Sequence, residues 1–318
     1  MVSDDVDVLV VMATYRRPEF LAEAIRSSLA QSGATKAIFV VDDCPDGSAK
    51  ATVEALGAPT VSYLRNPSPC SGGPSRVRNF GFAEAARRGV RARFVHYLDD
   101  DVVVPEGHYA TVRQAFNANP DAGVVFGNLQ AFTQLVAEPE RRARQQAHMC
   151  GFQGILDRTA RQARSYRDIG KRLASPTLAR MLYRQHALFG PPMFYCGCCI
   201  IRYEHAVALG GFAETVRLTE DLRYFGLAVH RYGAASLDRV ACHYRLSDIS
   251  LTRSLVITPE QAAAEAREMQ DAQRQWQIEL RRDLGPARYY AIKSVYKLGT
   301  RPLIDRVLQP MLMRTGSA

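Results

Sequence analysis

The sequence predicts an α/β fold in which a mostly parallel sheet is flanked by helices. Short apolar runs alternate with segments of helical periodicity between residues 6 and 132. The first run, VDVLVVM, shows no polar alternation, which is typical of a strand covered on both faces. Polar residues gather where the runs end, as expected at the carboxyl edge of a parallel sheet. An apolar content of 47% and a charged content of 23% over 318 residues are ordinary for a globular chain.

Each expected strand is an apolar run, and each helix is indicated by its ends. Proline or serine suits the first turn of a helix, and glycine accepts the left-handed backbone that closes one. In chain order the first elements are a strand at 6–12, a helix from Pro18 to Gly33, a strand at 37–41, a helix from Ser48 to Gly57, a strand at 61–64, a helix from Pro74 to Arg88, a strand at 94–98, a helix at 105–119 and a strand at 123–132.

The second half of the chain begins with a break in this alternation. Residues 137–192 are rich in Arg, Gln and Ala and predict a basic helical insertion, either solvated or serving as a lid or acceptor-docking surface. Strands at 193–201 and 234–243, with a helix at 222–232 between them, complete the core. An apolar stripe over 259–284, stopped by Gly285-Pro286, predicts an amphipathic helix. We expect an α/β domain over 1–254 and a helical extension over 255–318.

Three consecutive carboxylates, Asp99, Asp100 and Asp101, follow an apolar run in the segment HYLDDDVVVP at residues 96–105. Adjacent carboxylates repel one another, and a divalent cation is the simplest compensation. Oxygen ligands suit Mg²⁺ or Mn²⁺. On an extended backbone Asp99 and Asp101 would point to one side and Asp100 to the other. The alternative is a solvated acidic turn, because a bare Asp-x-Asp is short and common.

The charge balance limits the choice of partner and compartment. Lys and Arg exceed Asp and Glu by 41 to 32, which gives a net charge of +9 and suits an anionic partner. The seven cysteines, the acidic N-terminus and the lack of an apolar run of about 18 residues predict a reducing, cytoplasmic location. Cys196-x-Cys198-Cys199 lacks the spacing of a structural zinc site, so we expect buried packing residues there.

Five segments, in order, resemble the family 2 glycosyltransferases of the GT-A fold. They are VLVVMATYRRPEFLAEAIRSSLAQ, VVDDCPDGS, GGPSRVRNFGFAEA, LDDDVVVP and GGFAETVRLTEDLRYFGLAVHRYG. Cys44-Pro45 and Val77 depart from the usual Gly-Ser and Ala. The resemblance spans roughly residues 6–245 and implies a Rossmann-like nucleotide-binding half joined to an acceptor half. It also implies inverting, metal-dependent transfer of a sugar from a UDP- or dTDP-type donor to an acceptor hydroxyl, in surface glycan or glycoconjugate synthesis.

The resemblance further implies a donor site built from residues at the strand ends. The donor-binding residues would be Thr14, Tyr15, Arg16, Asp42, Asp43, Arg78, Asp99 and Asp100. The nucleotide's uracil-like base would lie against the carboxyl ends of the first strands. Arg78 would pair with a phosphate of the donor, and Asp99 would reach the ribose. Asp101 would bind Mn²⁺ or Mg²⁺ at the diphosphate, and the metal would act as a Lewis acid. His243 would complete the metal site, or would be a core histidine.

The same resemblance assigns the chemistry to Asp221 and Glu220. Asp221 would be the general base that takes the proton of the acceptor hydroxyl, and Glu220 would orient the acceptor or Asp221. The alternative for both is a helix N-terminus, where acidic side chains are favoured in any case.

Two other functions are open. A nucleotidyltransferase would show a glycine-rich phosphate loop after the first strand, where ATYRRP stands. An inactive basic membrane-binding scaffold would not need the acids at 99–101 and 220–221. The expected partners are a nucleoside-diphosphate sugar and a glycan, lipid-linked or small-molecule acceptor, without nucleic acid, and a homo-oligomer is left open. The basic and apolar tail at 288–313 suits peripheral contact with a membrane or, as the alternative, packing on the domain.

Overall fold

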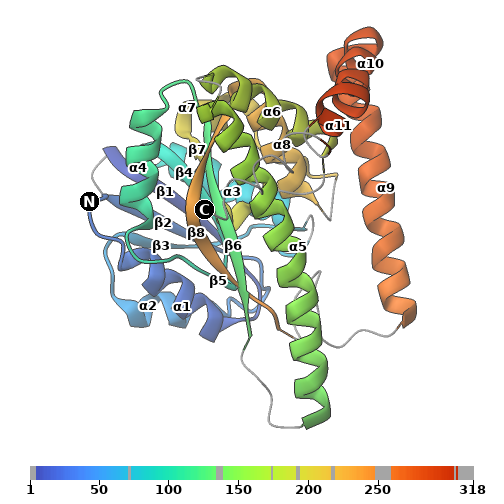
Figure 1. The fold of residues 1–318 in the computed structure, drawn as a ribbon. Helices are drawn as coiled ribbons and strands as arrows, with labels where there is room; N and C mark the ends of the chain where they lie inside the picture. Colours follow the sequence, from blue (N-terminus) through green and yellow to red (C-terminus); the bar gives the residue numbers. More distant parts are fainter. Residues whose placement is uncertain are drawn as a thin grey trace, which may run out of the picture.

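The computed structural model describes residues 5–70, 73–133, 139–172, 175–190, 194–215, 219–247, 259–303 and 306. These residues form a single curled sheet flanked by helices, with the strand order β3-β2-β1-β4-β7-β6-β8-β5 (Figure 1). Its strands are β1 (Asp5–Thr14), β2 (Lys36–Asp42), β3 (Val61–Arg65), β4 (Arg91–Asp99), β5 (Val102–Val103), β6 (Val124–Phe132), β7 (Cys199–Arg202) and β8 (Ala234–Arg245). The predicted α/β architecture is therefore confirmed.

The half of the sheet formed by β3, β2, β1 and β4 is entirely parallel. Residues 8–12 of β1 are almost completely buried, because helices cover the sheet where this strand lies at its centre. The register places Thr14 beside Asp42 and Ala13 beside Asp99. Three strands thus end at one edge and carry their last polar side chains to the same place, as the sequence predicted.

The other half of the sheet mixes directions. β7 runs antiparallel to β4 and β6, β8 runs parallel to β6, and β5 runs antiparallel to β8. The Arg245 N–H donates to the carbonyl of Asp101 at 3.0 Å, so β8 holds the chain where it leaves the acidic cluster. This half brings a second part of the sequence to the edge at which β1, β2 and β4 end.

The helices of the parallel half are α1 (Pro18–Leu29), α2 (Lys50–Leu56), α3 (Gly73–Arg87) and α4 (His108–Ala118). Two of them begin differently from the prediction. Asp42, not Ser48, accepts the N–H that opens α2, from Ala49 at 2.8 Å. α4 begins at His108 and not at 105, because Gly107 precedes it with a left-handed φ of 68°.

The insertion forms α5 (Pro139–Arg172) and α6 (Pro176–Phe189). The N-terminal end of α5 extends past the sheet in Figure 1, whereas its C-terminal half packs on the core. Tyr166 and Tyr183 are buried, and the Tyr183 hydroxyl donates to the carbonyl of Ala163. The Tyr183 ring lies edge-on to Phe126 of β6 at 5.3 Å. The insertion is therefore part of the hydrophobic core, which a purely solvated insertion would not be.

The last part of the core differs from the prediction at one strand. Of the strand expected at 193–201, residues 196–198 form the 3₁₀ turn η1 (Cys196–Cys198), and β7 begins at Cys199; residue 193 lies outside the described residues. α7 (Tyr203–Leu209) and α8 (Glu220–Tyr232) follow. α8 begins two residues before the predicted 222, so Glu220 and Asp221 lie in its first turn.

The C-terminal extension consists of α9 (Pro259–Leu284), α10 (Pro286–Ser294), the π-helical turn η2 (Val295–Thr300) and α11 (Arg301–Leu303). It rests on the core through a small cluster in which Leu280 and Tyr289 pack against Leu188 of α6. The domain boundary expected at 254 falls within 248–258, outside the described residues. None of the helices described here combines the length and the apolar character that crossing a bilayer demands.

Candidate active site

Strained backbone marks the loops at the carboxyl edge of the sheet. Among the described residues, the non-glycine residues with positive φ are Arg16 at 53°, Cys70 at 59° and Thr219 at 65°. They lie after β1, in the loop between β3 and α3, and before α8, respectively. Such conformations cost free energy and persist where surrounding contacts hold them, which is common at binding sites.

The loop after β1 presents Tyr15 and anchors itself on Asp100. The Thr14 hydroxyl donates to Asp100 Oδ2 at 2.8 Å, and the Tyr15 N–H approaches the same oxygen at 3.4 Å. The Tyr15 side chain is 40% exposed, and the Arg16 guanidinium lies 5.3 Å from its ring centroid. Arg16 also pairs with Asp46 at 3.2 Å. An aromatic ring with a cation beside it is therefore presented to solvent at this edge.

Asp42 and Asp43 hold the neighbouring loops in place. Buried Asp42 accepts the N–H groups of Cys44 and Ala49, at 2.9 and 2.8 Å, and so shapes the turn after β2. Asp43 accepts the Asn66 side-chain amide at 2.6 Å and the Cys70 N–H at 3.1 Å. Both carboxylates have structural partners, in addition to any contact they make with a ligand.

The three acids of the central cluster divide differently from the prediction. β4 ends at Asp99 and the chain turns at Asp100, so the alternation of an extended strand does not continue. Asp99 pairs with Arg78 at 2.5 Å, whereas Asp100 and Asp101 both pair with Arg17, at 3.1 and 2.8 Å. The expected pairing of Asp99 with Asp101 on one side is therefore wrong.

Burial sets the protonation of this cluster. Removal from water raises the pKa of Asp100 to about 7 and that of Asp101 to about 6, although the positive charge of Arg17 opposes the shift. Asp101 Oδ1 is buried without a hydrogen-bond partner within the described part of the chain. A buried carboxylate oxygen that lacks a donor can accept a proton or bind a cation.

Arg78 joins the two halves of the site. Its guanidinium donates to Asp99 at 2.5 Å and to Glu220 at 2.7 Å, and its side chain is only 4% exposed. The ring of Phe212 lies 5.3 Å from the guanidinium carbon. The Asn79 amide donates to the carbonyl of Phe212 at 2.9 Å and accepts its N–H at 2.7 Å, so α3 fixes the loop that carries this ring.

Asp221 lies beside this ion-pair cluster, in the first turn of α8. Its Oδ1 accepts the N–H of Leu222 at 2.8 Å, and its Oδ2 accepts the N–H of Cys196 at 3.3 Å. Burial and the neighbouring Glu220 raise the pKa of Asp221 to about 7. A carboxylate whose pKa lies near neutrality can take up a proton and release it again during a reaction cycle.

His243 lies on β8, opposite Val103 of β5. Its imidazole faces the ring of Phe132 edge-on at 6.4 Å, and burial lowers its pKa. Within the ranges that the structure describes, no three His, Cys, Asp or Glu side chains are arranged to hold a metal ion. Asp101 and His243 thus do not form a complete metal site by themselves.

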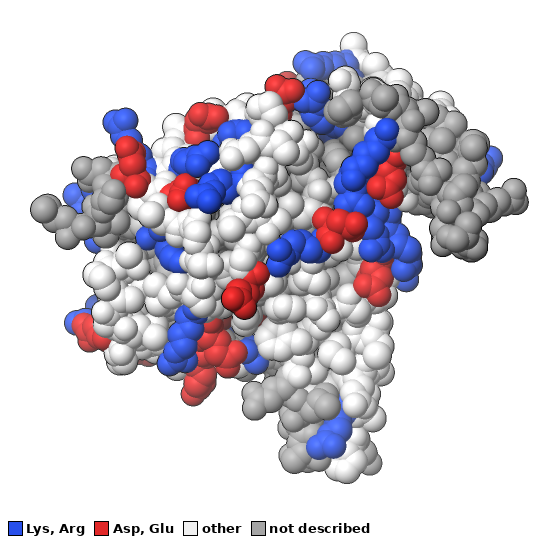
Figure 2. Space-filling view, turned by 60° about the vertical axis from the view of Figure 1, so that its left-hand side comes forward, with Lys and Arg blue, Asp and Glu red and all other residues white. Residues whose placement is uncertain are grey.

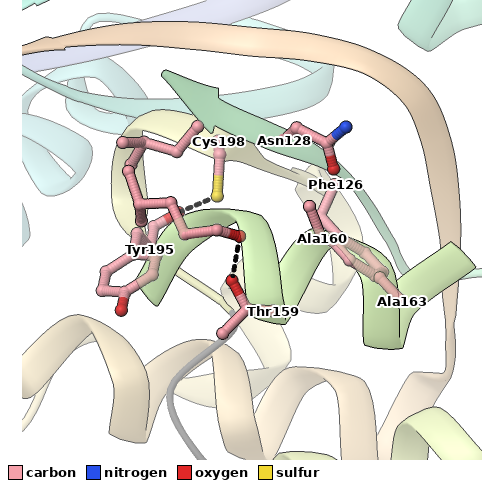
Figure 3. A pocket seen from close by; sticks show the side chains of 10 residues that line it. Phe126, Asn128, Thr159, Ala160, Ala163, Tyr195 and Cys198 are labelled. Carbon is pink, nitrogen blue, oxygen red and sulfur yellow. Dashed lines mark hydrogen bonds between the residues drawn. The ribbon is translucent and has the colours of Figure 1, made fainter. Parts of the chain in front are cut away.

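A pocket lies between β6 and the insertion helix α5, with Tyr195 and Cys198 in its wall (Figure 3). It encloses about 280 Å³ of empty space, part of it open to solvent. Its lining residues are Phe126, Gly127, Asn128, Leu129, Leu156, Thr159, Ala160, Ala163, Tyr195 and Cys198. Tyr195 precedes Cys196, whose N–H contacts Asp221, so the pocket wall continues into the site.

Sequence reasoning missed four parts of this site: Arg17, Cys196, Phe212 and the pocket. Arg17 stands in a quoted motif, and its signal is a basic side chain immediately after the first strand. Cys196 acts through its backbone, so its identity gives no signal.

The surplus of Lys and Arg does not form one continuous basic patch on the face in Figure 2, where Lys and Arg are interspersed with Asp and Glu.

Comparisons with known proteins show which family and fold the chain resembles. The model of the family described as "Glycosyl transferase family 2" matches residues 9–204. The chain is 38% identical over 104 residues to "Succinoglycan biosynthesis protein ExoO" of Rhizobium meliloti (strain 1021). That match covers 31% of the chain and only 27% of the relative's length.

Solved structures share the fold. TarS 1-349 of S. aureus in complex with UDP-GlcNAc superposes with a TM-score of 0.56 at 15% identity, over 95% of this chain and 76% of that one. Mannosyltransferase PcManGT of Pyrobaculum calidifontis, in complex with GDP-Man and Mn²⁺, gives a TM-score of 0.50 at 17% identity, over 78% and 59% of the two chains. At these identities the likeness establishes the fold alone, and the predicted GT-A architecture is confirmed.

Proposed function

Because the chain belongs to glycosyl transferase family 2, we propose that it transfers a sugar from a nucleoside-diphosphate sugar to an acceptor hydroxyl, in the synthesis of a glycan or glycoconjugate. One observation carries the proposal. Asp221, a buried carboxylate with a pKa near 7, lies next to a cluster in which Arg78 links Asp99 to Glu220. This arrangement sets Asp221, a proton acceptor, beside Arg78 and Asp99, which would bind the sugar-nucleotide donor.

The donor would bind along the edge where β1, β2 and β4 end. Thr14, Tyr15, Arg16, Asp42, Asp43, Arg78, Asp99 and Asp100 are the proposed donor-binding residues. Exposed Tyr15 offers a surface on which a base can stack, and Arg16 and Arg78 offer positive charge to the diphosphate. A UDP- or dTDP-type donor is our proposal, since a carboxylate at this edge can accept the ring N–H of a pyrimidine.

The transfer would be a single inverting displacement. Asp221 takes the proton from the acceptor hydroxyl while that oxygen attacks C1 of the sugar and the nucleoside diphosphate leaves. The ion pair with Arg78 fixes the orientation of the Glu220 side chain. Glu220 would therefore position Asp221 and the acceptor rather than compete for the proton.

The acidic cluster fits a divalent cation in part. Asp101 supplies a buried oxygen without a donor, which suits Mn²⁺ or Mg²⁺, and donor phosphates would complete the coordination. We include His243 as a candidate ligand that would have to approach from β8. A bound cation would act as a Lewis acid at the diphosphate.

The C-terminal extension would give peripheral contact with a membrane. Along α10 and η2, Tyr289 and Tyr296 face the core, whereas Tyr290, Val295 and Leu298 are 52%, 53% and 82% exposed. Residues 284–304 contain four basic residues and no Asp or Glu. An apolar face with positive charge suits an anionic leaflet. The tail residues from 307 onward, also considered in the sequence, lie outside the described residues.

The test is turnover by the full-length protein on a panel of UDP-, dTDP- and GDP-sugars, each with Mn²⁺ and with EDTA. We expect release of the nucleoside diphosphate from at least one donor, faster with Mn²⁺, and release that is at least about 100-fold slower with Asp101→Ala or Asp221→Asn. Pyrophosphate release from a nucleoside triphosphate and a sugar phosphate would favour a nucleotidyltransferase instead. Absence of both activities, with the fold intact, would favour the inactive scaffold.

A further inference from the structure

Arg17 is the feature of the site that the proposed function leaves without a role. It precedes α1 and reaches across the edge of the sheet to residues 83 and 84 positions later in the chain. Its Nη2 pairs with Asp100 Oδ1 at 3.1 Å and its Nη1 donates to Asp101 Oδ2 at 2.8 Å. The side chain is 17% exposed, so these ion pairs are only partly screened by water.

We propose that Arg17 is a resident counter-ion that competes with the divalent cation for Asp100 and Asp101. The inference rests on the metal site of the proposed function. One guanidinium already neutralises part of the charge of two buried carboxylates, and it pairs with Asp100 Oδ1 and Asp101 Oδ2, next to the donor-free Oδ1 of Asp101 that a cation would bind. A divalent ion that binds Asp101 must therefore displace Arg17 or share the carboxylate with it.

Displacement sends the guanidinium toward the donor side. Arg17 lies in the loop that also carries Tyr15 and Arg16, at the edge where the diphosphate would lie. A guanidinium released from two carboxylates can form bidentate hydrogen bonds with phosphate. Metal and donor would then each favour the binding of the other, because the donor gives Arg17 an alternative partner. Arg17 is thus a positioning residue for the cluster.

The experiment measures Mn²⁺ binding to the full-length protein without nucleotide, by electron paramagnetic resonance of free Mn²⁺ at pH 8. Arg17→Gln removes the competitor, and we expect Mn²⁺ to bind it about tenfold more tightly than the wild type. Arg26 lies on the exposed side of α1, the helix that Arg17 precedes, and Arg26→Gln removes the same charge. This variant is the matched control, and we expect its affinity for Mn²⁺ to equal that of the wild type. Arg17→Lys, which keeps the charge, should remain close to the wild type.

Thermal unfolding supplies a second readout that does not depend on catalysis. Loss of Arg17 leaves two buried carboxylates without their cation, so Arg17→Gln should melt below the wild type. Added Mn²⁺ should raise its melting temperature more than that of the wild type. Equal or weaker Mn²⁺ binding by Arg17→Gln would overturn the role of Arg17 alone. Absence of Mn²⁺ binding by every variant, both without nucleotide and with UDP added to supply the phosphates, would overturn the proposed metal site as well.

Discussion

The carboxyl group of Asp221 accepts two backbone N–H groups and, within the part of the chain that the structure describes, forms no ion pair with an arginine. Arg78 forms its ion pairs with the neighbouring Asp99 and Glu220 instead. Burial therefore dominates, and the pKa of Asp221 rises to about 7. The side chain is oriented without being locked in its charged form, as a general base requires.

Replacement of Asp221 by Asn should abolish the base while preserving the shape of the site. We expect kcat to fall by about 10²–10⁴-fold, with donor affinity within a few-fold of the wild type. In the wild type the base works only when deprotonated, so kcat should decline as the pH falls below about 7. Steady-state kinetics from pH 5 to 9 measure both effects. A collapse of donor binding with an unchanged kcat would make Asp221 a binding residue.

The same pKa has a consequence for stability. A carboxyl group whose folded pKa exceeds its unfolded pKa stabilises the fold at low pH, and this contribution is lost as the pH rises from about 4 to about 7. Asp221→Asn should therefore be more stable than the wild type at pH 8, by about 1–3 kcal/mol, and the difference should shrink at pH 5. Urea unfolding at the two pH values provides the measurement. A variant less stable than the wild type at pH 8 would contradict the assignment.

At the scale of elements, the loop between α7 and α8 depends on a glycine. Gly211 has a φ of 99°, and a Cβ there would lie 2.6 Å from Oδ1 of Asn79. The same Oδ1 accepts the Phe212 N–H, so a Cβ at residue 211 would push against the hydrogen bond between Asn79 and Phe212. The loop delivers Phe212 to Arg78, and through it the geometry of the site depends on α3.

Gly211→Ala should combine backbone strain with a steric clash. We expect a loss of about 2 kcal/mol or more of unfolding free energy, together with weaker donor turnover because Phe212 moves. Gly151→Ala is the control: this helical glycine of α5 has open space around its Cβ position, so alanine should be neutral or slightly stabilising. Chemical denaturation of the two variants compares them directly. Equal stability of the two would show that the loop adapts freely.

Sequence reasoning predicted the elements whose signals are local. The apolar runs indicated β1, β2 and β4, and their ends correctly gathered Thr14, Asp42 and Asp99. Sequence reasoning failed where a contact joins residues that are far apart in the chain. Cys196 turns inward to meet Asp221, which lies 25 residues away, and Arg17 meets Asp101 across 84 residues. No periodicity records such contacts, because each depends on how the sheet is closed.

At the scale of the whole molecule, the surplus of Lys and Arg favours membrane binding only where basic residues lie beside exposed apolar residues. Figure 1 shows α10 and α11 at the end of α9, on the outside of the molecule. Four of the large apolar residues that are exposed in the described part of the chain lie in this extension: Ile278, Tyr290, Val295 and Leu298. The other exposed large apolar residues, Tyr15, Ile155, Met181 and Val207, are spread over four different elements or loops, whereas Tyr290, Val295 and Leu298 lie within nine residues of one another.

The double variant Val295→Glu/Leu298→Glu should weaken membrane association without disturbing the core, because both side chains are exposed. In flotation with vesicles rich in phosphatidylserine, we expect at least a tenfold loss of bound protein. Val207→Glu, which changes another exposed valine on α7, should float like the wild type. Neutral phosphatidylcholine vesicles should bind all three proteins poorly. Equal flotation of the double variant and the wild type would remove this face from the proposal.

The ion pair between Arg78 and Glu220 spans 142 positions of the chain. The contact therefore needs both α3, which carries Arg78, and α8, which carries Glu220, to be present in the chain. During synthesis, a ribosome-bound chain that lacks α8 would hold the proposed donor edge without Asp221, the proposed base. We therefore expect such an unfinished chain to leave an activated sugar donor unspent.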